Sequence, residues 1–257
     1  MTWDPQQYLK FGAPRLRPAI DLLNRIEHAS PNEVYDIGAG PGNVTPLLRA
    51  RWPGAHVTGV DESQEMLDTA RAALPDVEWV RADLAHWTPA RPADVLYSNA
   101  ALHWLNDHAT LFPRLLSSLA PGGVLAVQMP RNFAAASHTE VDSAVRAGPW
   151  RARLEPLLRP LSVATPAEYY DLLAPRAATL DIWETEYLHV LRGDNPVKEW
   201  IKGSRLKPLL DALEEPLRTG FEAEYAARVK AAYPPRADGC TLLPFRRLFI
   251  VATARSA

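Results

Sequence analysis

Short runs of β-branched and other apolar residues alternate with helical periodicities over the first half of the chain. Each run is bounded by turn or polar residues, and the runs lie at 34–37, 56–60, 77–80, 95–98 and 124–129. Between them apolar residues recur at helical spacing, as at Val44, Leu47 and Leu48. This alternation of strand and helix predicts a parallel sheet with helices on both faces.

The rhythm changes after Pro130. Residues 131–178 are rich in alanine, proline and arginine and show mainly helical patterns, and a second helical region occupies 191–241. Two further β-like runs, at 180–190 and 242–252, predict strands that complete the sheet at its edge.

We therefore expect a single α/β domain over residues 1–257. Its centre is a Rossmann-like sheet of seven mostly parallel strands with helices on both faces, and residues 1–130 form its core. The helical inserts at 131–178 and 191–241 form a cap over this core.

Size and composition suit a globular protein outside the membrane. The chain has 257 residues and a mass of 28.5 kDa, and 47% of its residues are hydrophobic. It contains no apolar run near the roughly 20 residues needed to span a bilayer, and its start has neither the basic nor the apolar segment of a secretory signal. We therefore expect a cytoplasmic protein that does not associate with membranes.

The charge balance and the cysteine and histidine content argue against nucleic-acid binding, an internal disulfide and a metal site. The 28 basic and 30 acidic side chains nearly cancel, giving −2, so no strong field favours nucleic acid. The single cysteine, Cys240, excludes an internal disulfide and a cysteine-built zinc site. The histidines at 28, 56, 86, 108 and 138 show no metal-ligand spacing. We expect neither a nucleic-acid partner nor a metal centre.

The most informative segment follows the first predicted strand. Residues 34–42 read Val-Tyr-Asp-Ile-Gly-Ala-Gly-Pro-Gly, which delivers Asp36 into a loop containing Gly38, Gly40 and Gly42, and a helical pattern begins at once. Without Cβ atoms such a loop can turn tightly and let a bulky ligand approach its N–H groups at the mouth of an open α/β sheet. The loop therefore predicts a site for a nucleotide-type cofactor.

Two cofactor classes compete for this loop. A dinucleotide site favours Gly-x-Gly-x-x-Gly, whose third glycine would stand at Asn43, whereas this chain has Gly-x-Gly-x-Gly. Asp61, at the end of the second predicted strand, suits the ribose hydroxyls of either cofactor. Asp83 ends the third strand in Arg-Ala-Asp-Leu, where it is placed to accept a hydrogen bond from an adenine amino group. The glycine spacing counts against NAD.

The same residues resemble the successive motifs of the class I S-adenosylmethionine-dependent methyltransferases. The motifs follow the expected order, as Asp36-x-Gly38-x-Gly40-x-Gly42, Asp61, Asp83-Leu84, Asn99 and Leu119-x-Pro121-Gly122-Gly123. The resemblance implies S-adenosylmethionine as cofactor, S-adenosylhomocysteine as its product, and residues 1–130 as the cofactor-binding core.

The resemblance also implies a role for each motif residue. The glycine loop, through Gly38 and Gly40, borders the methionine portion of the cofactor, and Asp61 holds the ribose. Asp83 and Leu84 contact adenine. The alternative is that Asp83 is an ordinary strand-end cap.

Three further residues belong to the same predicted site. Asn99 lies beside the amino acid moiety. Met66 packs on the adenine face, with an ordinary core position as the alternative. Asp36 either orients the loop or touches the ligand.

Resemblance to a narrower group extends over nearly the whole length. It rests on Trp3-x-Pro5-x-x-Tyr8, Arg15-x-Arg17-Pro18, Ser98-Asn99-Ala100-Ala101-Leu102-His103-Trp104-Leu105, Ala126-Val127-Gln128-Met129-Pro130 with Asn132, Asp181-Ile182-Trp183 and Arg247-Leu248-Phe249-Ile250-Val251-Ala252. These segments are similar to those of the trans-aconitate 2-methyltransferases, whereas Arg131 and the region 198–207 depart from the pattern. The resemblance implies O-methylation of one carboxylate of a small polyanionic acid, trans-aconitate or a close relative, to its monomethyl ester.

Cationic and aromatic residues are the candidates for holding such an acid. Arginine binds planar carboxylates through paired hydrogen bonds, and Arg247, flanked by Leu248 and Phe249, lies on a predicted buried strand where an unpaired charge is costly. His103 follows the fourth strand, where it contacts a carboxylate, acts as a base or is structural. No residue is assigned a certain catalytic role, and His103 and Arg247 are the positioning candidates. The substrate-binding candidates are Tyr8, Arg15, His103, Trp104, Arg131, Tyr187 and Arg247.

Three alternatives stay open at this point. The first retains the cofactor and methylates another acceptor, such as a carrier-linked carboxylate or an aromatic ring. The second is an NAD-dependent oxidoreductase, disfavoured by Asn43 and by the lack of an evident hydride-transfer pair. The third is a non-catalytic S-adenosylmethionine-binding protein, which would keep the glycine loop and lack a cationic substrate pocket.

Overall fold

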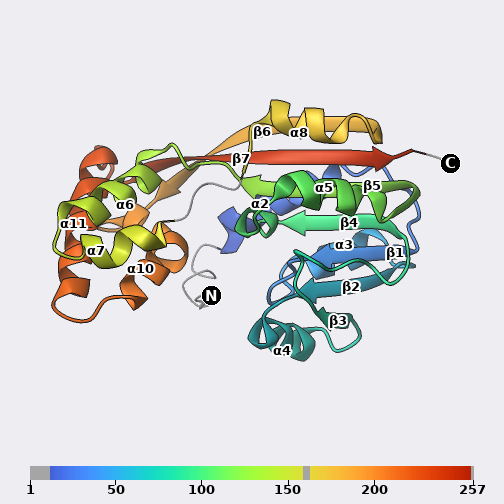
Figure 1. Cartoon of the computed structure of the whole chain (residues 1–257), viewed down its shortest axis with the longest axis horizontal. Coiled ribbons are helices and arrows are strands. Elements are labelled where there is room, and N and C mark those ends of the chain that lie inside the picture. The colour runs from blue at the N-terminus through green and yellow to red at the C-terminus, as the bar shows by residue number, and fades with distance from the viewer. Residues whose placement is uncertain (1–11, 159–162, 256–257) are drawn as a thin grey trace. The chain divides into compact units, whose positions relative to one another are not determined.

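The computed structural model describes residues 12–158 and 163–255 (Figure 1). Within these residues the chain forms two compact units. The sheet unit comprises residues 16–130, 163–185 and 247–255, and the helical unit comprises residues 12–15, 131–158 and 186–246. The change in sequence rhythm after Pro130 therefore coincides with the passage of the chain into the helical unit.

Seven strands in the described part of the chain form one sheet, in the order β3-β2-β1-β4-β5-β7-β6 (Figure 1). Strands β1 to β5 pair in parallel, and β7 pairs antiparallel with β5. Their bounds are β1 Glu33–Ile37, β2 His56–Asp61, β3 Glu78–Arg81, β4 Ala93–Asn99, β5 Leu119–Pro130, β6 Ala177–Leu191 and β7 Thr241–Ala254. The predicted α/β class, with a Rossmann-like, mostly parallel sheet, is confirmed.

Helices connect these strands and pack around the sheet. Three of them begin at side-chain caps: the Ser63 hydroxyl accepts from the Met66 amide at 3.4 Å, the Asp107 carboxylate from the Thr110 amide at 3.2 Å, and the Thr165 hydroxyl from the Glu168 amide at 3.3 Å. The helices of the sheet unit are α2 Gly12–Asn24, which belongs to it from Leu16 onward, α3 Thr45–Arg51, α4 Gln64–Ala73, the 3-10 turn η1 Leu102–Trp104, α5 His108–Ser117 and α8 Pro166–Leu173.

The strand order creates a switch point between β1 and β4. The chain runs from β1 outward to β2 and β3 before it returns to form β4 on the other side of β1. At such a point the loops that follow the two strands diverge and open a crevice at the carboxyl ends of the strands. The glycine loop follows β1 at Ile37, and β4 ends at Asn99.

The helical unit has a hydrophobic core of its own. Its buried residues include Val145, Trp200, Leu210, Phe221 and Tyr225. Its helices are α6 Ala136–Ala147, α7 Arg151–Leu154, the 3-10 turn η2 Glu155–Leu157, α9 Pro196–Ile201, the π-helical turn η3 Lys202–Leu206, α10 Lys207–Asp211 and α11 Leu217–Ala232. No helix within the described ranges of either unit combines the length and the apolar content that a bilayer crossing requires.

Candidate functional site

The glycine loop folds back over the end of β2. The amides of Gly38 and Ala39 both donate to the Val60 carbonyl, at 2.8 and 3.1 Å. Gly38 has φ +75°, and a Cβ there would lie 2.1 Å from the Ala101 Cβ, so no larger residue fits. Gly40 has φ +55°, and a Cβ there would meet nothing within 4 Å. The backbone therefore packs tightly at Gly38 and opens outward at Gly40.

Asp61 ties the open part of the loop to helix α4. One carboxylate oxygen accepts from the Gly40 amide at 2.8 Å, and the other accepts from the Ser63 amide at 2.9 Å. Each carboxylate oxygen has a second lone pair, so Asp61 can hold these two amides and still accept from two hydroxyl groups. Asp61 therefore has the acceptor capacity that the two hydroxyls of a ribose need.

Asp36 lies beneath the loop and is only 2% exposed. Its carboxylate accepts from the Thr45 hydroxyl at 2.7 Å, which links the end of β1 to the first turn of α3. Burial, which outweighs the bond from Thr45 and is reinforced by the charge of Asp61, raises the pKa of Asp36 to about 7. This geometry favours the loop-orienting role over direct contact with a ligand.

The segment after β3 brings the predicted adenine residues beside the loop. Asp83 is exposed and accepts from the Ala85 amide at 2.9 Å, and the buried Leu84 side chain lies 3.6 Å from the position of a Cβ on Gly38. Met66, on the first turn of α4, is buried. Asp83 thus does cap a turn, and its carboxylate remains accessible to a ligand.

Arg114 of α5 holds this segment in place, and the sequence reasoning did not identify it. Its guanidinium donates to the carbonyl of Leu84 at 2.9 Å, to that of Ala85 at 3.0 Å and to that of Trp87. The residue stands on the polar side of an amphipathic helix, so the sequence pattern gives no sign of contacts about thirty positions away.

Three polar residues meet on one face of the sheet, near the carboxyl ends of β4 and β5 and in the middle of β7. We call Asn99, Gln128 and Arg247 the amide–arginine cluster. Asn99 and Gln128 are register partners on neighbouring strands, and Arg247 pairs with Pro130, so the three share one face. Arg247 is 5% exposed and donates from Nη1 to Gln128 Oε1 at 3.4 Å. The sequence-based expectation that Arg247 is buried agrees with this position.

His103 and Trp104 lie in the turn η1, after β4. Their ring centroids are 4.6 Å apart, with His103 partly buried and Trp104 43% exposed. On the same unit, Trp183 stacks against Phe249, with centroids 4.7 Å apart and an angle of 8° between the rings. Exposed Trp104 is available to cover a ligand at the end of β4.

The remaining substrate candidates are not brought together within the sheet unit. Arg131 and Tyr187 belong to the helical unit, where the Arg131 amide donates to the Arg246 carbonyl at 3.0 Å and Tyr187 lies buried next to His189. Tyr8 and the side chain of Arg15 lie outside the described residues.

The basic residues between Lys198 and Lys207 form ion pairs with acidic residues of the same unit. Glu222 accepts from Lys198 at 3.0 Å and from Lys202 at 2.6 Å. Arg205 donates to Asp142 at 2.6 Å, and Lys207 donates to Asp211 at 3.0 Å. These pairs favour a structural role for the basic residues at 198–207 over the binding of an anionic substrate.

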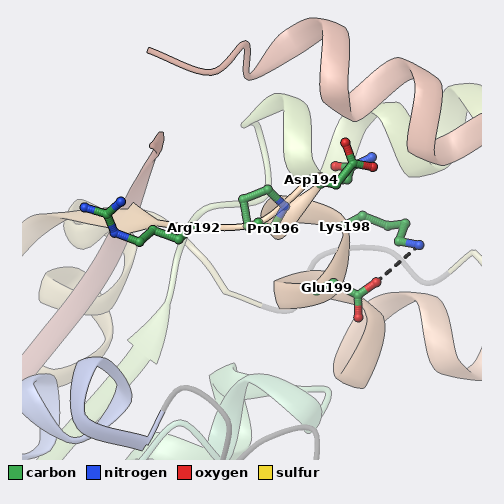
Figure 2. A pocket seen from close by; sticks show the side chains of 7 residues that line it. Arg192, Asp194, Pro196, Lys198 and Glu199 are labelled. Atoms are coloured by element: carbon green, nitrogen blue, oxygen red, sulfur yellow. Dashed lines mark ion pairs between the residues drawn. The ribbon is translucent and has the colours of Figure 1, made fainter. Parts of the chain in front are cut away.

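A surface hollow at the start of α9 is also lined by charged residues (Figure 2). Lys198 pairs there with Glu199 at 3.2 Å, and Asp194 pairs with Lys230 at 2.7 Å. The hollow contains none of the residues that the sequence predicts for the site, and the basic and acidic residues that line it are equal in number.

The described residues fit an adenosine-containing cofactor at the edge formed by β1, β2 and β4. The open backbone at Gly40, the spare acceptor capacity of Asp61 and the exposed Asp83 meet the needs of an amino acid tail, a ribose and an adenine. Among the described residues, no group of three or more His, Cys, Asp or Glu side chains is arranged to hold a metal ion.

Comparison with known proteins agrees with this geometry. Residues 34–123 match the family described as "Methyltransferase domain". A protein of Azoarcus sp. (strain BH72) named trans-aconitate 2-methyltransferase is 51% identical over 251 residues, which cover 98% of this chain and 98% of that protein. One of the same name from Methylobacterium radiotolerans is 46% identical over 257 residues, covering 99% of each.

Solved structures share the fold at low sequence identity. A phosphoethanolamine N-methyltransferase 2 of Haemonchus contortus, in complex with S-adenosyl-L-methionine, aligns with a TM-score of 0.60 at 16% identity and covers 97% of this chain and 56% of that chain. An S-adenosylmethionine-dependent methyltransferase from Mesorhizobium loti aligns with a TM-score of 0.52 at 21% identity and covers 94% and 98%.

Proposed function

The chain belongs to the trans-aconitate 2-methyltransferases, and from this premise we propose that it transfers the methyl group of S-adenosylmethionine to one carboxylate of trans-aconitate. The products are a monomethyl ester and S-adenosylhomocysteine. The observation that carries the proposal is the presence, on one sheet, of a glycine loop tied to Asp61 and a buried arginine beside Gln128. Family membership favours this reaction over hydride transfer and over binding alone.

The residues of the glycine-loop edge hold the cofactor. Asp61 accepts hydrogen bonds from the ribose hydroxyls, Asp83 and Leu84 contact adenine, and Asn99 lies beside the amino acid portion of the cofactor. Asp36, Met66 and the glycines shape this site from below. When bound, S-adenosylmethionine supplies a sulfonium methyl group, which a carboxylate oxygen takes as the carbon–sulfur bond breaks and its electron pair passes to sulfur.

The reaction requires no general base. Carboxyl groups titrate around pH ~4, so the attacking oxygen of the acid is already ionised at neutral pH. The chain contributes by aligning this oxygen with the methyl carbon and by excluding water from it. His103 and Trp104, at the end of β4, therefore act in positioning rather than in proton removal.

Arg247 holds a carboxylate that is not methylated. A guanidinium binds a carboxylate through two parallel hydrogen bonds, and burial strengthens that interaction because little water screens it. Arg247 suits this role because it is 5% exposed and its guanidinium lies beside Gln128, to which Nη1 donates at 3.4 Å. A second carboxylate is thereby fixed while the first faces the methyl group.

Substitution of Arg247 tests this assignment. Arg247→Met removes the guanidinium and keeps most of the volume, so we expect the KM for trans-aconitate to rise roughly 100-fold with the dissociation constant of S-adenosylhomocysteine unchanged. Arg246→Met is the matched control, because Arg246 is the next residue on β7, is exposed and points to the opposite face. An unchanged KM in the Arg247 variant would remove this residue from the site.

The choice of acceptor is tested separately. The protein is incubated with S-adenosylmethionine and either a set of tricarboxylic acids or a carrier-linked carboxylic acid, and methyl esters are identified by mass spectrometry. We expect esters from trans-aconitate. Turnover of the carrier-linked acid alone would move the proposal to that acceptor.

A further inference from the structure

Gln128 interrupts an otherwise apolar stretch of β5. Val124, Leu125, Ala126, Val127 and Met129 are hydrophobic and buried, and Gln128 among them is 0% exposed. A buried amide costs free energy unless its donors and acceptor are satisfied, so buried amides in protein interiors have partners.

Arg247 determines which way this amide points. A guanidinium has donors only, so the atom of Gln128 that faces Arg247 Nη1 at 3.4 Å is the oxygen, Oε1. The NH2 group consequently faces away from the guanidinium. Its nitrogen, Nε2, is buried and meets no acceptor among the described residues.

Asn99, on the neighbouring strand, has the complementary unsatisfied group, a hydrogen-bond acceptor. It is the register partner of Gln128 in the parallel pair of β4 and β5, so both side chains lie on the same face. Its Oδ1 is buried and meets no donor in the described part of the chain. Two adjacent amides with unsatisfied groups mark a polar position that a ligand or an ordered water fills.

The order of the strands in the sheet indicates that the ligand beside Gln128 is the acid rather than the cofactor. β5 is two strands away from β1, about 10 Å from the strand that carries the glycine loop, with β4 between them. Gln128 therefore lies on the Arg247 side of Asn99. The nearby guanidinium makes this the part of the face where an anion is favoured.

We propose that Gln128 is a specificity-determining residue that donates a hydrogen bond from Nε2 to a carboxylate of the acid substrate, next to the one from Arg247. This inference rests on the proposed function and deepens it by naming a neutral donor in the acid-binding site. Arg247 attracts the carboxylate by its positive charge. Gln128 fixes the orientation of that carboxylate, because its amide is already oriented before the acid binds.

Binding measurements test the role of Gln128 without relying on turnover. Trans-aconitate is titrated by calorimetry into protein saturated with S-adenosylhomocysteine, for the wild type, Gln128→Leu and Gln128→Glu. Leucine removes the donor at similar volume, and we expect the dissociation constant of the acid to rise roughly 10- to 100-fold. Glutamate places a negative charge beside Arg247, and we expect a larger loss. Affinity for S-adenosylhomocysteine should stay the same in both.

Ser98→Ala is the matched control. Ser98 is also fully buried and donates to the Ile37 carbonyl at 2.9 Å, but it precedes Asn99 and so faces the other side of the sheet. We expect its melting temperature to fall and its affinity for both ligands to remain that of the wild type.

Two results would overturn the inference and leave the reaction intact. Wild-type affinity for the acid in Gln128→Leu would assign the amide to a structural water. Weaker binding of S-adenosylhomocysteine with unchanged binding of the acid would assign it to the cofactor. The proposed function itself fails if the wild type neither binds trans-aconitate nor methylates it, and the inference about Gln128 then fails with it.

Discussion

At Asp36, an ordinary residue type acquires an unusual proton affinity from its surroundings. Burial, together with the charge of Asp61, raises the pKa of Asp36 to about 7, although Thr45 donates a hydrogen bond to the carboxylate. The side chain therefore titrates in the physiological range directly beneath the glycine loop.

This shift makes stability depend on pH. The ordinary pKa of 3.8 applies to the unfolded chain, so between about pH 4 and 7 the folded protein holds a proton that the unfolded chain releases. The stabilising contribution is complete below that window and is lost as the pH rises through it. Asp36→Asn removes the titration, so its free energy of unfolding relative to the wild type should increase by on the order of 3 kcal/mol from pH 4 to pH 8. Urea denaturation at several pH values measures this, and a difference independent of pH would contradict it.

Asp61 holds the Gly40 amide and, in the proposed cofactor site, also accepts from the ribose. Asp61→Ala deletes the acceptor for a ribose and the tether to the Gly40 amide, so we expect affinity for S-adenosylhomocysteine to fall roughly 30-fold. Asp68→Ala, an exposed carboxylate on α4, is the control. Calorimetry with both variants measures the effect, and equal affinities would exclude Asp61 from the cofactor site.

Residues of the site differ in how far the sequence could predict them. The glycines and Asp61 are recognisable because their function depends on local backbone geometry and on their place at a strand end. Gln128 carries a weaker signal, a single polar residue within a buried strand. Its importance depends on Arg247, 119 positions away, and no local pattern reveals that contact.

Among the elements, α5 supports the cofactor site from a distance. Arg114 connects this helix to three carbonyl groups of the turn after β3, those of Leu84, Ala85 and Trp87. Ala85 and His86 of this turn are exposed, so apart from the buried Leu84 and the backbone bonds to the Asp83 carbonyl, the bonds from Arg114 hold its shape. The position of Asp83 therefore depends on a helix that does not itself contain a predicted cofactor residue.

Arg114→Met should weaken this support. We expect a loss of about 1–3 kcal/mol in the free energy of unfolding and a several-fold weaker binding of S-adenosylhomocysteine, with the KM for the acid unchanged at saturating cofactor. Arg49→Met, at an exposed position on α3, is the matched control. A variant with normal cofactor affinity would show that the turn keeps its shape without α5.

Strand cores were predictable and strand ends were not. The pattern predicts a strand at 124–129, after a Pro-Gly-Gly turn, whereas β5 begins at Leu119. Leu119 pairs with Ala93 of β4, and the register then shifts before Val95 pairs with Val124. Pairing across the sheet, which propensity does not report, extends this strand through residues that are typical of turns.

For the whole molecule, the net charge of −2 gives a polyanion no general attraction. Recognition must then depend on a few local cations, and catalysis on position rather than on proton transfer. We expect kcat at saturating substrates to be constant between about pH 6 and 8, because the carboxylates of the acid are ionised throughout that range. A rise in kcat that follows one group titrating near pH 6.5, and that persists in Asp36→Asn, would instead indicate a histidine base.

The most direct test is to follow the methyl group itself. The wild-type protein is incubated with trans-aconitate and S-adenosylmethionine whose methyl group carries deuterium, and the products are measured by mass spectrometry. We predict a monomethyl ester of trans-aconitate that contains the intact labelled methyl group, formed in equal amount with S-adenosylhomocysteine. Absence of labelled ester from protein that binds both compounds would contradict the account.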